Sequence, residues 1–116
     1  MTIEQMKNIC KVSDQIWICR GDMGVQLGYV GMAKFVKEFT RNYLPSLKIP
    51  VIMAGEVMEH FCEHNTPTRT EMCYLGNCIA DGYKGLVLSD ETVFGKFPNE
   101  AMNFCSSFIR EFEGEL

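Results

Sequence analysis

The first segment whose residue types could do chemistry is Arg20-Gly21-Asp22-Met23-Gly24, in which two glycines bracket one carboxylate. Glycines let the backbone turn tightly and present amide groups to an anion, and a carboxylate such as Asp22 can hold a hard divalent cation. The segment therefore predicts an anion or metal site. The alternative interpretation is a glycine turn in which Asp22 caps a helix.

Two further polar segments follow apolar runs. Ser89-Asp90-Glu91-Thr92 combines hydroxyl groups with two carboxylates, and Gly55-Glu56 places a carboxylate after a glycine. Groups of the first kind can organise a metal ion, a water molecule or a proton relay. A solvated, capped loop is the alternative for residues 89–92.

A literal match to a zinc-hydrolase signature, H-x-x-E-H, lies at His60-Phe61-Cys62-Glu63-His64. The signature requires a third ligand from another element, and the chain contains no further histidine. Five-residue patterns also match by chance. We therefore interpret His60 and His64 as two exposed histidines on a short helix.

Three short apolar runs are the elements that must position these segments. They occupy residues 16–19, 51–54 and 86–88, and their first residues lie 35 positions apart. Continuous apolar runs are typical of strands buried on both faces of a parallel sheet, and about 35 residues accommodate one strand and its crossover helix. Ligand sites in such sheets gather at the carboxyl ends of the strands, where the polar segments at 20–24, 55–56 and 89–92 begin.

Helical periodicity fills the segments around these runs. Apolar residues recur every three or four positions over residues 29–43 and again over residues 98–112, where Pro98 suits the first turn of a helix. Each pattern predicts a helix with one buried face. Thr2 and Gln5 form a potential capping box, which predicts another helix before the first strand.

The second crossover is interrupted at Pro67, which predicts two helices, at residues 56–64 and 68–80, the second ended by Gly82. The predicted order is therefore α-β-α-β-α-α-β-α, an α/β fold. Because no low-complexity stretch or linker divides the chain, we expect residues 1–116 to form a single domain.

Composition excludes several classes of partner. The 116 residues include 11 Lys and Arg against 15 Asp and Glu, and the net charge of −4 argues against nucleic acid as a partner. No apolar run approaches the roughly 18 residues of a membrane helix, and the first residues lack a signal-peptide pattern. We therefore expect no membrane association and a cytoplasmic location. The six cysteines show no C-x-x-C spacing, and we interpret them as reduced core residues.

Taken together and in order, these motifs resemble the pyruvate kinase family. The likeness runs from about Ser13 to Phe108, and four ordered motifs at matching spacing are far more specific than any one of them. The motifs resemble the family's R-G-D-L-G, P-V-I-x-A-T-Q, P-T-R-A-E and L-S-G-E-T…G-K-Y-P-x-E-A. In the same order, the segments of this chain are Arg20-Gly21-Asp22-Met23-Gly24, Pro50-Val51-Ile52-Met53-Ala54-Gly55-Glu56, Pro67-Thr68-Arg69-Thr70-Glu71, and Leu88-Ser89-Asp90-Glu91-Thr92 with Gly95-Lys96-Phe97-Pro98 and Glu100-Ala101. The resemblance implies the last three β/α units of the family's (β/α)8 TIM barrel.

The resemblance also implies roles for individual residues. Asp22 matches the carboxylate that binds the catalytic Mg²⁺ or Mn²⁺, and the substrate-binding positions are Arg20, Gly21, Asp22 and Gly55. Ser89 and Glu91 match strand-end residues of the proton-transfer network, and Arg69 matches an arginine at the family's subunit interface. In the family, these parts transfer a phosphoryl group from phosphoenolpyruvate to ADP in glycolysis, giving pyruvate and ATP with K⁺ as a further cofactor.

This chain departs from the family pattern at several positions. The K-x-E motif, whose lysine and glutamate serve the phosphoryl group and the metal, belongs to a strand before residue 16 and would lie upstream of Met1. Gly55 replaces a threonine, Glu56 a glutamine and Asp90 a glycine, so negative charge is added near an anionic substrate. We therefore expect the isolated chain to be inactive, to bind Mg²⁺ or Mn²⁺ weakly, and to lack the K⁺ site.

A non-catalytic remnant or an interaction scaffold that keeps the β/α fold is the alternative function. Three parallel strands cannot close a barrel, and their edges and inner face remain unpaired. We therefore expect a homo-oligomer, or a partner chain that supplies the missing strands.

Overall fold

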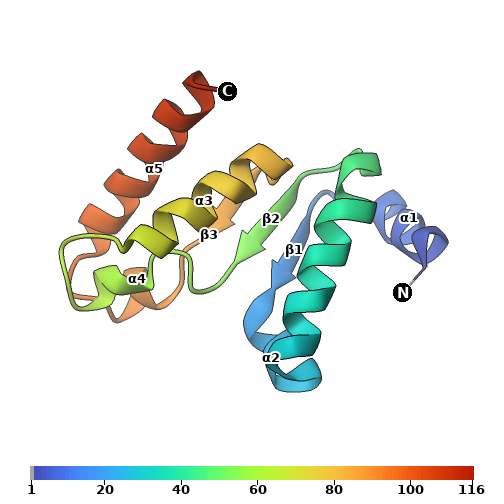
Figure 1. Cartoon of the computed structure of the whole chain (residues 1–116), viewed down its shortest axis with the longest axis horizontal. Coiled ribbons are helices and arrows are strands. Elements are labelled where there is room, and N and C mark those ends of the chain that lie inside the picture. The colour runs from blue at the N-terminus through green and yellow to red at the C-terminus, as the bar shows by residue number, and fades with distance from the viewer. Residues whose placement is uncertain (1) are drawn as a thin grey trace.

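The computed structural model describes residues 2–116 and contains three strands and five α-helices (Figure 1). Along the chain these are α1 (Ile3–Lys11), β1 (Ile16–Cys19), α2 (Arg20–Glu38), β2 (Val51–Ala54), α3 (Arg69–Asp81), β3 (Gly85–Val87), α4 (Asp90–Val93) and α5 (Pro98–Gly114). A π-helical turn (Phe39–Tyr43) and a 3-10 turn (Leu44–Ser46) follow α2, and a second 3-10 turn (Glu59–Cys62) precedes α3.

The strands form one parallel sheet in the order β1-β2-β3. In its register Ile18 lies opposite Met53, and Met53 lies opposite Leu86. Parallel neighbours place their carboxyl ends at the same edge, so the segments after β1, β2 and β3 emerge side by side. Figure 1 shows the crossover helices α2 and α3 in front of the strands. The predicted α/β fold of parallel strands and crossover helices is confirmed.

The core lies on the helix-covered face of the sheet, in two clusters. The first joins β1 and β2 to α1 and the end of α2, and the second joins α3 and α5 to the turn at 59–62. Their buried members are Met6, Ile18, Phe39, Leu44, Val51, Met53, Cys78 and Tyr83 in the first, and Val57, Met58, Phe61, Leu75, Ala101 and Cys105 in the second.

The opposite face of the sheet is less covered than the sequence predicts. Side chains alternate along a strand, so Trp17 and Cys19 point away from the face that Ile18 buries. Trp17 is 53% exposed and Cys19 is also exposed. The expectation that β1 is buried on both faces is therefore wrong, because none of the described helices packs over these two side chains.

Helix ends follow local sequence signals. The predicted capping box of α1 is present, since Gln5 N donates to Thr2 Oγ1 at 3.1 Å and Thr2 N donates to Gln5 Oε1 at 2.8 Å. The same arrangement of Thr68 and Glu71 begins α3. Gly82 ends α3 with φ of 110°, a left-handed conformation that glycine adopts without a steric penalty.

The structure differs from the predicted elements in four places, one of which is a shift by one residue: the strand predicted at 86–88 is β3, Gly85–Val87. α2 begins at Arg20, directly after β1, and Gly28 kinks it with φ of 72°. The helix predicted at 56–64 is replaced by bends and the short 3-10 turn at 59–62, and α4 was not predicted. Of the six cysteines, all free, Cys19 and Cys73 are exposed, so the interpretation of all six as core residues is wrong.

No helix among residues 2–116 has the length and hydropathy needed to cross a membrane.

Candidate functional site

A cavity of about 600 Å³ lies where the three strands end. Four residues that sequence reasoning assigned to substrate or catalysis line it together, namely Arg20, Gly21, Gly55 and Ser89. Gly28, Tyr29 and Met32 of α2 form another part of its wall. The carboxyl ends of β1, β2 and β3 thus contribute to one cavity, as expected of a parallel sheet.

Arg20 connects the ends of β1 and β2. Its Nη2 donates a hydrogen bond to the Gly55 carbonyl oxygen, and its guanidinium carbon lies 4.8 Å from the centre of the Tyr74 ring, a cation–π geometry. Its Nε is buried and has no acceptor among the described residues. These contacts hold the guanidinium in a fixed position beside the cavity.

The turn after β2 has an unusual backbone. Gly55 has φ of 83° and Glu56 has φ of 50°, so two consecutive residues adopt left-handed conformations. Glycine tolerates this conformation, whereas a side chain such as that of Glu56 rarely does. Glu56 therefore lies in a strained turn on the wall of the cavity, where it adds negative charge.

Carboxylates outnumber cations around this cavity. Glu56, Glu59 and Asp90 line it, whereas Arg20 is the only basic side chain in its wall among the described residues. The pKa of Glu59 is raised above its usual value by burial and by repulsion from Asp90, Glu91 and Glu56. The electrostatic field of the cavity therefore favours cations over anions.

Glu91 is fully buried and binds backbone amides. Its Oε1 accepts a hydrogen bond from Met58 N at 3.2 Å, and its Oε2 accepts one from Ser89 N at 3.1 Å. Through this side chain, the segment after β3 is tied to the segment after β2. These contacts give Glu91 a structural role, while the catalytic role that the resemblance implies stays a prediction.

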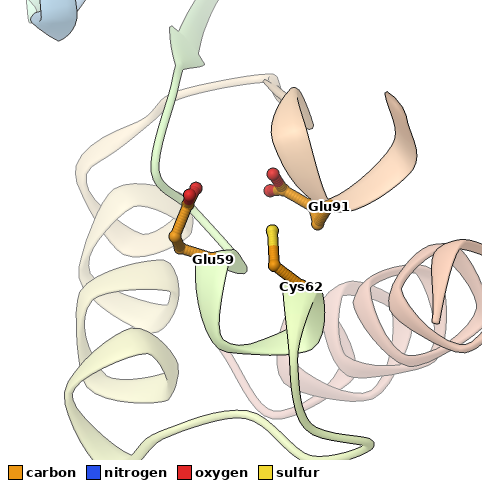
Figure 2. Close-up of side chains that lie close together, drawn as sticks. All are labelled: Glu59, Cys62 and Glu91. Atoms are coloured by element: carbon orange, nitrogen blue, oxygen red, sulfur yellow. The ribbon is translucent and has the colours of Figure 1, made fainter. Parts of the chain in front are cut away.

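Glu59, Cys62 and Glu91 converge on one point (Figure 2), and one ligand atom from each lies within 4.8 Å of the others. Burial raises the pKa of the Cys62 thiol, with a further contribution from the negative charges of Glu59 and Glu91. Glu59 Oε2 is buried and has no hydrogen-bond partner among residues 2–116. Two carboxylates and a thiol suit a softer ion such as Zn²⁺ better than Mg²⁺, which prefers oxygen ligands.

Sequence reasoning missed Glu59 and Cys62 as candidate ligands. Their three-residue spacing is a local signal, but the contact with Glu91 spans about thirty positions and depends on how the strand ends meet. The segment carrying them was also predicted as part of a longer helix, whereas it forms the 3-10 turn at 59–62.

Asp22 and Arg69 do not line the cavity at the strand ends. Asp22 is exposed in the first turn of α2, next to Gly21 of the cavity wall, but does not itself line the cavity. Asp22 does not belong to a group of three or more metal-ligating side chains among the described residues. A single carboxylate fits a Mg²⁺ ion that keeps most of its water. Arg69 is exposed at the start of α3.

The H-x-x-E-H segment does not form the helix that its signature requires. The His60 and His64 rings stack with centroids 4.2 Å apart, and His60 Nδ1 lies 2.6 Å from the Thr66 carbonyl oxygen. Glu63 pairs with Lys96 at 2.7 Å. His64 is exposed, whereas His60 is half-buried, so the expectation of two exposed histidines is correct only for His64.

Comparison with known proteins identifies the family. A family model described as the pyruvate kinase barrel domain matches residues 1–102. The chain belongs to the pyruvate kinase family. It is 37% identical over 114 residues to a pyruvate kinase of Thermotoga maritima, covering 98% of this chain and 24% of that protein. It is 33% identical over 111 residues to a pyruvate kinase of Encephalitozoon cuniculi, covering 96% of this chain and 26% of the relative.

A crystal structure of a pyruvate kinase from Cryptosporidium parvum has a similar fold, with a TM-score of 0.74 and 29% identity. The match covers 98% of this chain and 23% of that one. This chain thus spans about a quarter of the length of the pyruvate kinases it matches. The predicted relationship to the pyruvate kinase barrel is confirmed.

Proposed function

We propose that the strand-end cavity is the part of a pyruvate kinase site that the last three β/α units provide. The observation that carries the proposal is that Arg20, Gly21, Gly55 and Ser89, which three different strand ends supply, line one cavity. The family's reaction, from phosphoenolpyruvate and ADP to pyruvate and ATP, is the activity to which this part belongs. Family membership and this convergence support the proposal.

The residues at the three strand ends have different chemical roles in this proposal. Arg20, fixed by Gly55 and Tyr74, supplies positive charge for an anionic group, and the amide of Gly21 at the start of α2 adds a hydrogen-bond donor. A Mg²⁺ ion held by Asp22 would offset charge on the transferred phosphoryl group. The hydroxyl of Ser89 lies in the wall where a proton donor or its water would be needed.

We also propose that the 116-residue polypeptide does not catalyse this reaction by itself. No K-x-E triplet occurs in its sequence, so the family's lysine and second metal carboxylate are not supplied. Glu56, Glu59 and Asp90 add negative charge to a cavity with one arginine in its described wall. Repulsion of an anionic substrate and an uncompensated transition-state charge both oppose turnover.

A coupled pyruvate assay with Mg²⁺ and K⁺ tests this proposal. We expect no turnover above the protein-free rate. Metal-dependent turnover that disappears in Asp22→Ala would refute it, provided that the Asp14→Ala control, which alters another exposed aspartate, keeps the rate.

Metal binding is tested separately by Mn²⁺ titration followed by water-proton relaxation. A single exposed carboxylate predicts a dissociation constant of about a millimolar or weaker at Asp22. Asp22→Asn should abolish the relaxation enhancement, whereas Asp14→Asn should not. If Asp22→Asn leaves the titration unchanged and Glu59→Gln reduces it, Mn²⁺ is bound by the Glu59, Cys62 and Glu91 group instead.

An interaction scaffold is the second candidate function, and the exposure of Trp17 favours it. Trp17 and Cys19 lie on the less covered face of the sheet, and β1 and β3 are edge strands with unpaired backbone groups. We propose that this face is covered by a second copy or by a chain that supplies further strands. Light scattering after size-exclusion chromatography should show a species larger than a monomer, which Trp17→Lys should dissociate. A compact wild-type monomer at micromolar concentration would exclude self-association.

A further inference from the structure

Residues of the two crossover helices line a second cavity. It has a volume of about 730 Å³ and lies between α2 with its π-helical turn and α3. Arg20 and Met32 border both this cavity and the one at the strand ends. Four further residues line this cavity alone, namely Val36, Lys37, Arg41 and Tyr74. We refer to it as the α2/α3 groove.

The groove is positively charged although the chain carries a net charge of −4. Arg20, Lys37 and Arg41 line it, against one carboxylate, Asp81. None of these three cations has an ion-pair partner among residues 2–116, where the ion pair found joins Lys96 to Glu63. Arg20 is held by the Gly55 carbonyl and the Tyr74 ring, so Lys37 and Arg41 are the charges available to an anion in the groove.

Lys37 and Arg41 are four positions apart on the same side of one helical segment. Like charges at this spacing repel each other and destabilise the helix. An anion bound between them would remove this repulsion and gain two charge-assisted contacts. Arg41 lies in the π-helical turn Phe39–Tyr43, a type of irregularity that is frequent at functional sites.

The rest of the groove supplies an apolar wall and a base closed by a hydrogen bond. Met32 and Val36 of α2 and Tyr74 of α3 line the groove. At the base, Thr40 Oγ1 and the Tyr83 hydroxyl oxygen are 2.7 Å apart, and this hydrogen bond ties the π-helical turn after α2 to the segment after α3. A preformed cavity with apolar walls and a few charged groups is typical of small-molecule sites.

We propose that the α2/α3 groove binds a small organic anion whose carboxylate or phosphate group is held by Lys37 and Arg41. Its apolar body packs against Met32, Val36 and Tyr74. Both head groups present oxygen atoms with delocalised negative charge, which suits lysine and arginine alike. The groove shares Arg20 and Met32 with the proposed catalytic cavity, but Lys37 and Arg41 line the groove alone, and anion binding there does not depend on any activity at the strand ends.

NMR titration of the ¹⁵N-labelled full chain tests the proposal. The probes are 3-phenylpropionate for the carboxylate, phenyl phosphate for the phosphate, and 3-phenylpropanol as a neutral analogue. We expect saturable shifts of amide signals in residues 32–41 and 74–83 with at least one anion. The anion that binds more tightly identifies the head group. The neutral alcohol should bind at least about tenfold more weakly, because it lacks the charge that Lys37 and Arg41 recognise.

A matched pair of double variants gives the second measurement. Lys37→Gln with Arg41→Gln should weaken anion binding by about tenfold or more. The control, Lys34→Gln with Arg110→Gln, removes the same charge from exposed positions outside the groove and should change anion binding less than about twofold. Equal losses in both pairs, equal binding of the alcohol, or no saturable binding of either anion would overturn the proposal. The comparison of anion and alcohol on the wild-type chain keeps this test decisive even if a variant fails to fold.

Discussion

Replacement of Glu91 by alanine should destabilise the fold strongly. The side chain is fully buried and accepts hydrogen bonds from two backbone amides, Met58 N and Ser89 N. Alanine leaves both amides buried without an acceptor, and it also creates a cavity. The ends of β2 and β3 would then lose the contact that holds them together.

The magnitude follows from these two hydrogen bonds. Bonds to charged groups contribute about 1.5 to 3 kcal/mol each. The distances of 3.2 and 3.1 Å are longer than the roughly 2.8 Å of the strongest charge-assisted bonds, so we use the lower end of that range. Glu91→Ala should therefore lower the free energy of unfolding by about 3 kcal/mol. Glu91→Gln, which keeps one oxygen acceptor, should lower it by about half as much.

Urea unfolding followed by far-UV circular dichroism at pH 7 measures both effects. Glu111→Gln, which removes one exposed carboxylate on α5, should unfold like the wild type. A small domain has a total stability of about 5 to 15 kcal/mol, so the milder Glu91→Gln stays measurable if the alanine variant is largely unfolded. If Glu91→Ala unfolds within about 1 kcal/mol of the wild type, the two hydrogen bonds do not stabilise the strand ends as we argue.

Three further predictions concern single side chains. Thr68→Ala should lower the free energy of unfolding by about 1 kcal/mol in the same urea experiment, because it removes the cap of α3, and Thr68→Ser should restore it. Burial, with the charge of Glu91, raises the pKa of Cys105 to about 11. Iodoacetamide at pH 8 should therefore alkylate the exposed Cys73 much faster than Cys105, and equal alkylation rates by mass spectrometry would contradict this. Because the folded-state pKa of Glu59 is raised, its ionisation reduces stability as pH rises through that pKa. Glu59→Gln should therefore be more stable than the wild type at pH 7, and the gain should vanish below the usual glutamate pKa of 4.5. A gain that persists at acidic pH would exclude this cause.

Much of the fold could be predicted because its signals are local. The apolar runs at 16–19 and 51–54 coincide with β1 and β2, and the capping residue Thr2 and the terminating residue Gly82 lie where helices begin and end. These features depend on residues within one turn of each other or within one strand.

The irregular elements could not be predicted in the same way. The apolar periodicity of residues 29–43 does not distinguish an α-helix from one that ends in a π-helical turn, since both present similar faces. The pattern at 56–64 was compatible with a helix. The chain instead turns through Gly55 and Glu56 in left-handed conformations, and tertiary contacts outweigh the local preference.

The candidate site was predicted in part. Arg20 and Gly55 were assigned through the family resemblance, in segments that follow two parallel strands, and both residues line the same cavity. The group of Glu59, Cys62 and Glu91 depends on packing between segments far apart in sequence, which no spacing rule encodes. Family resemblance likewise assigned a function to Glu91 without indicating that its oxygens bind backbone amides.

The two charged side chains that organise the strand ends, Arg20 and Glu91, both form their hydrogen bonds with main-chain atoms. A main-chain carbonyl or amide is present whatever amino acid occupies the position, and only proline lacks the amide. These hydrogen bonds therefore do not depend on which side chains occupy positions 58 and 89, whereas the φ of 83° at position 55 still favours glycine. In a lineage that loses the reaction, the framework of the site would outlast its chemistry, and the persistence of Arg20 or Glu91 alone would not reveal whether catalysis is still under selection.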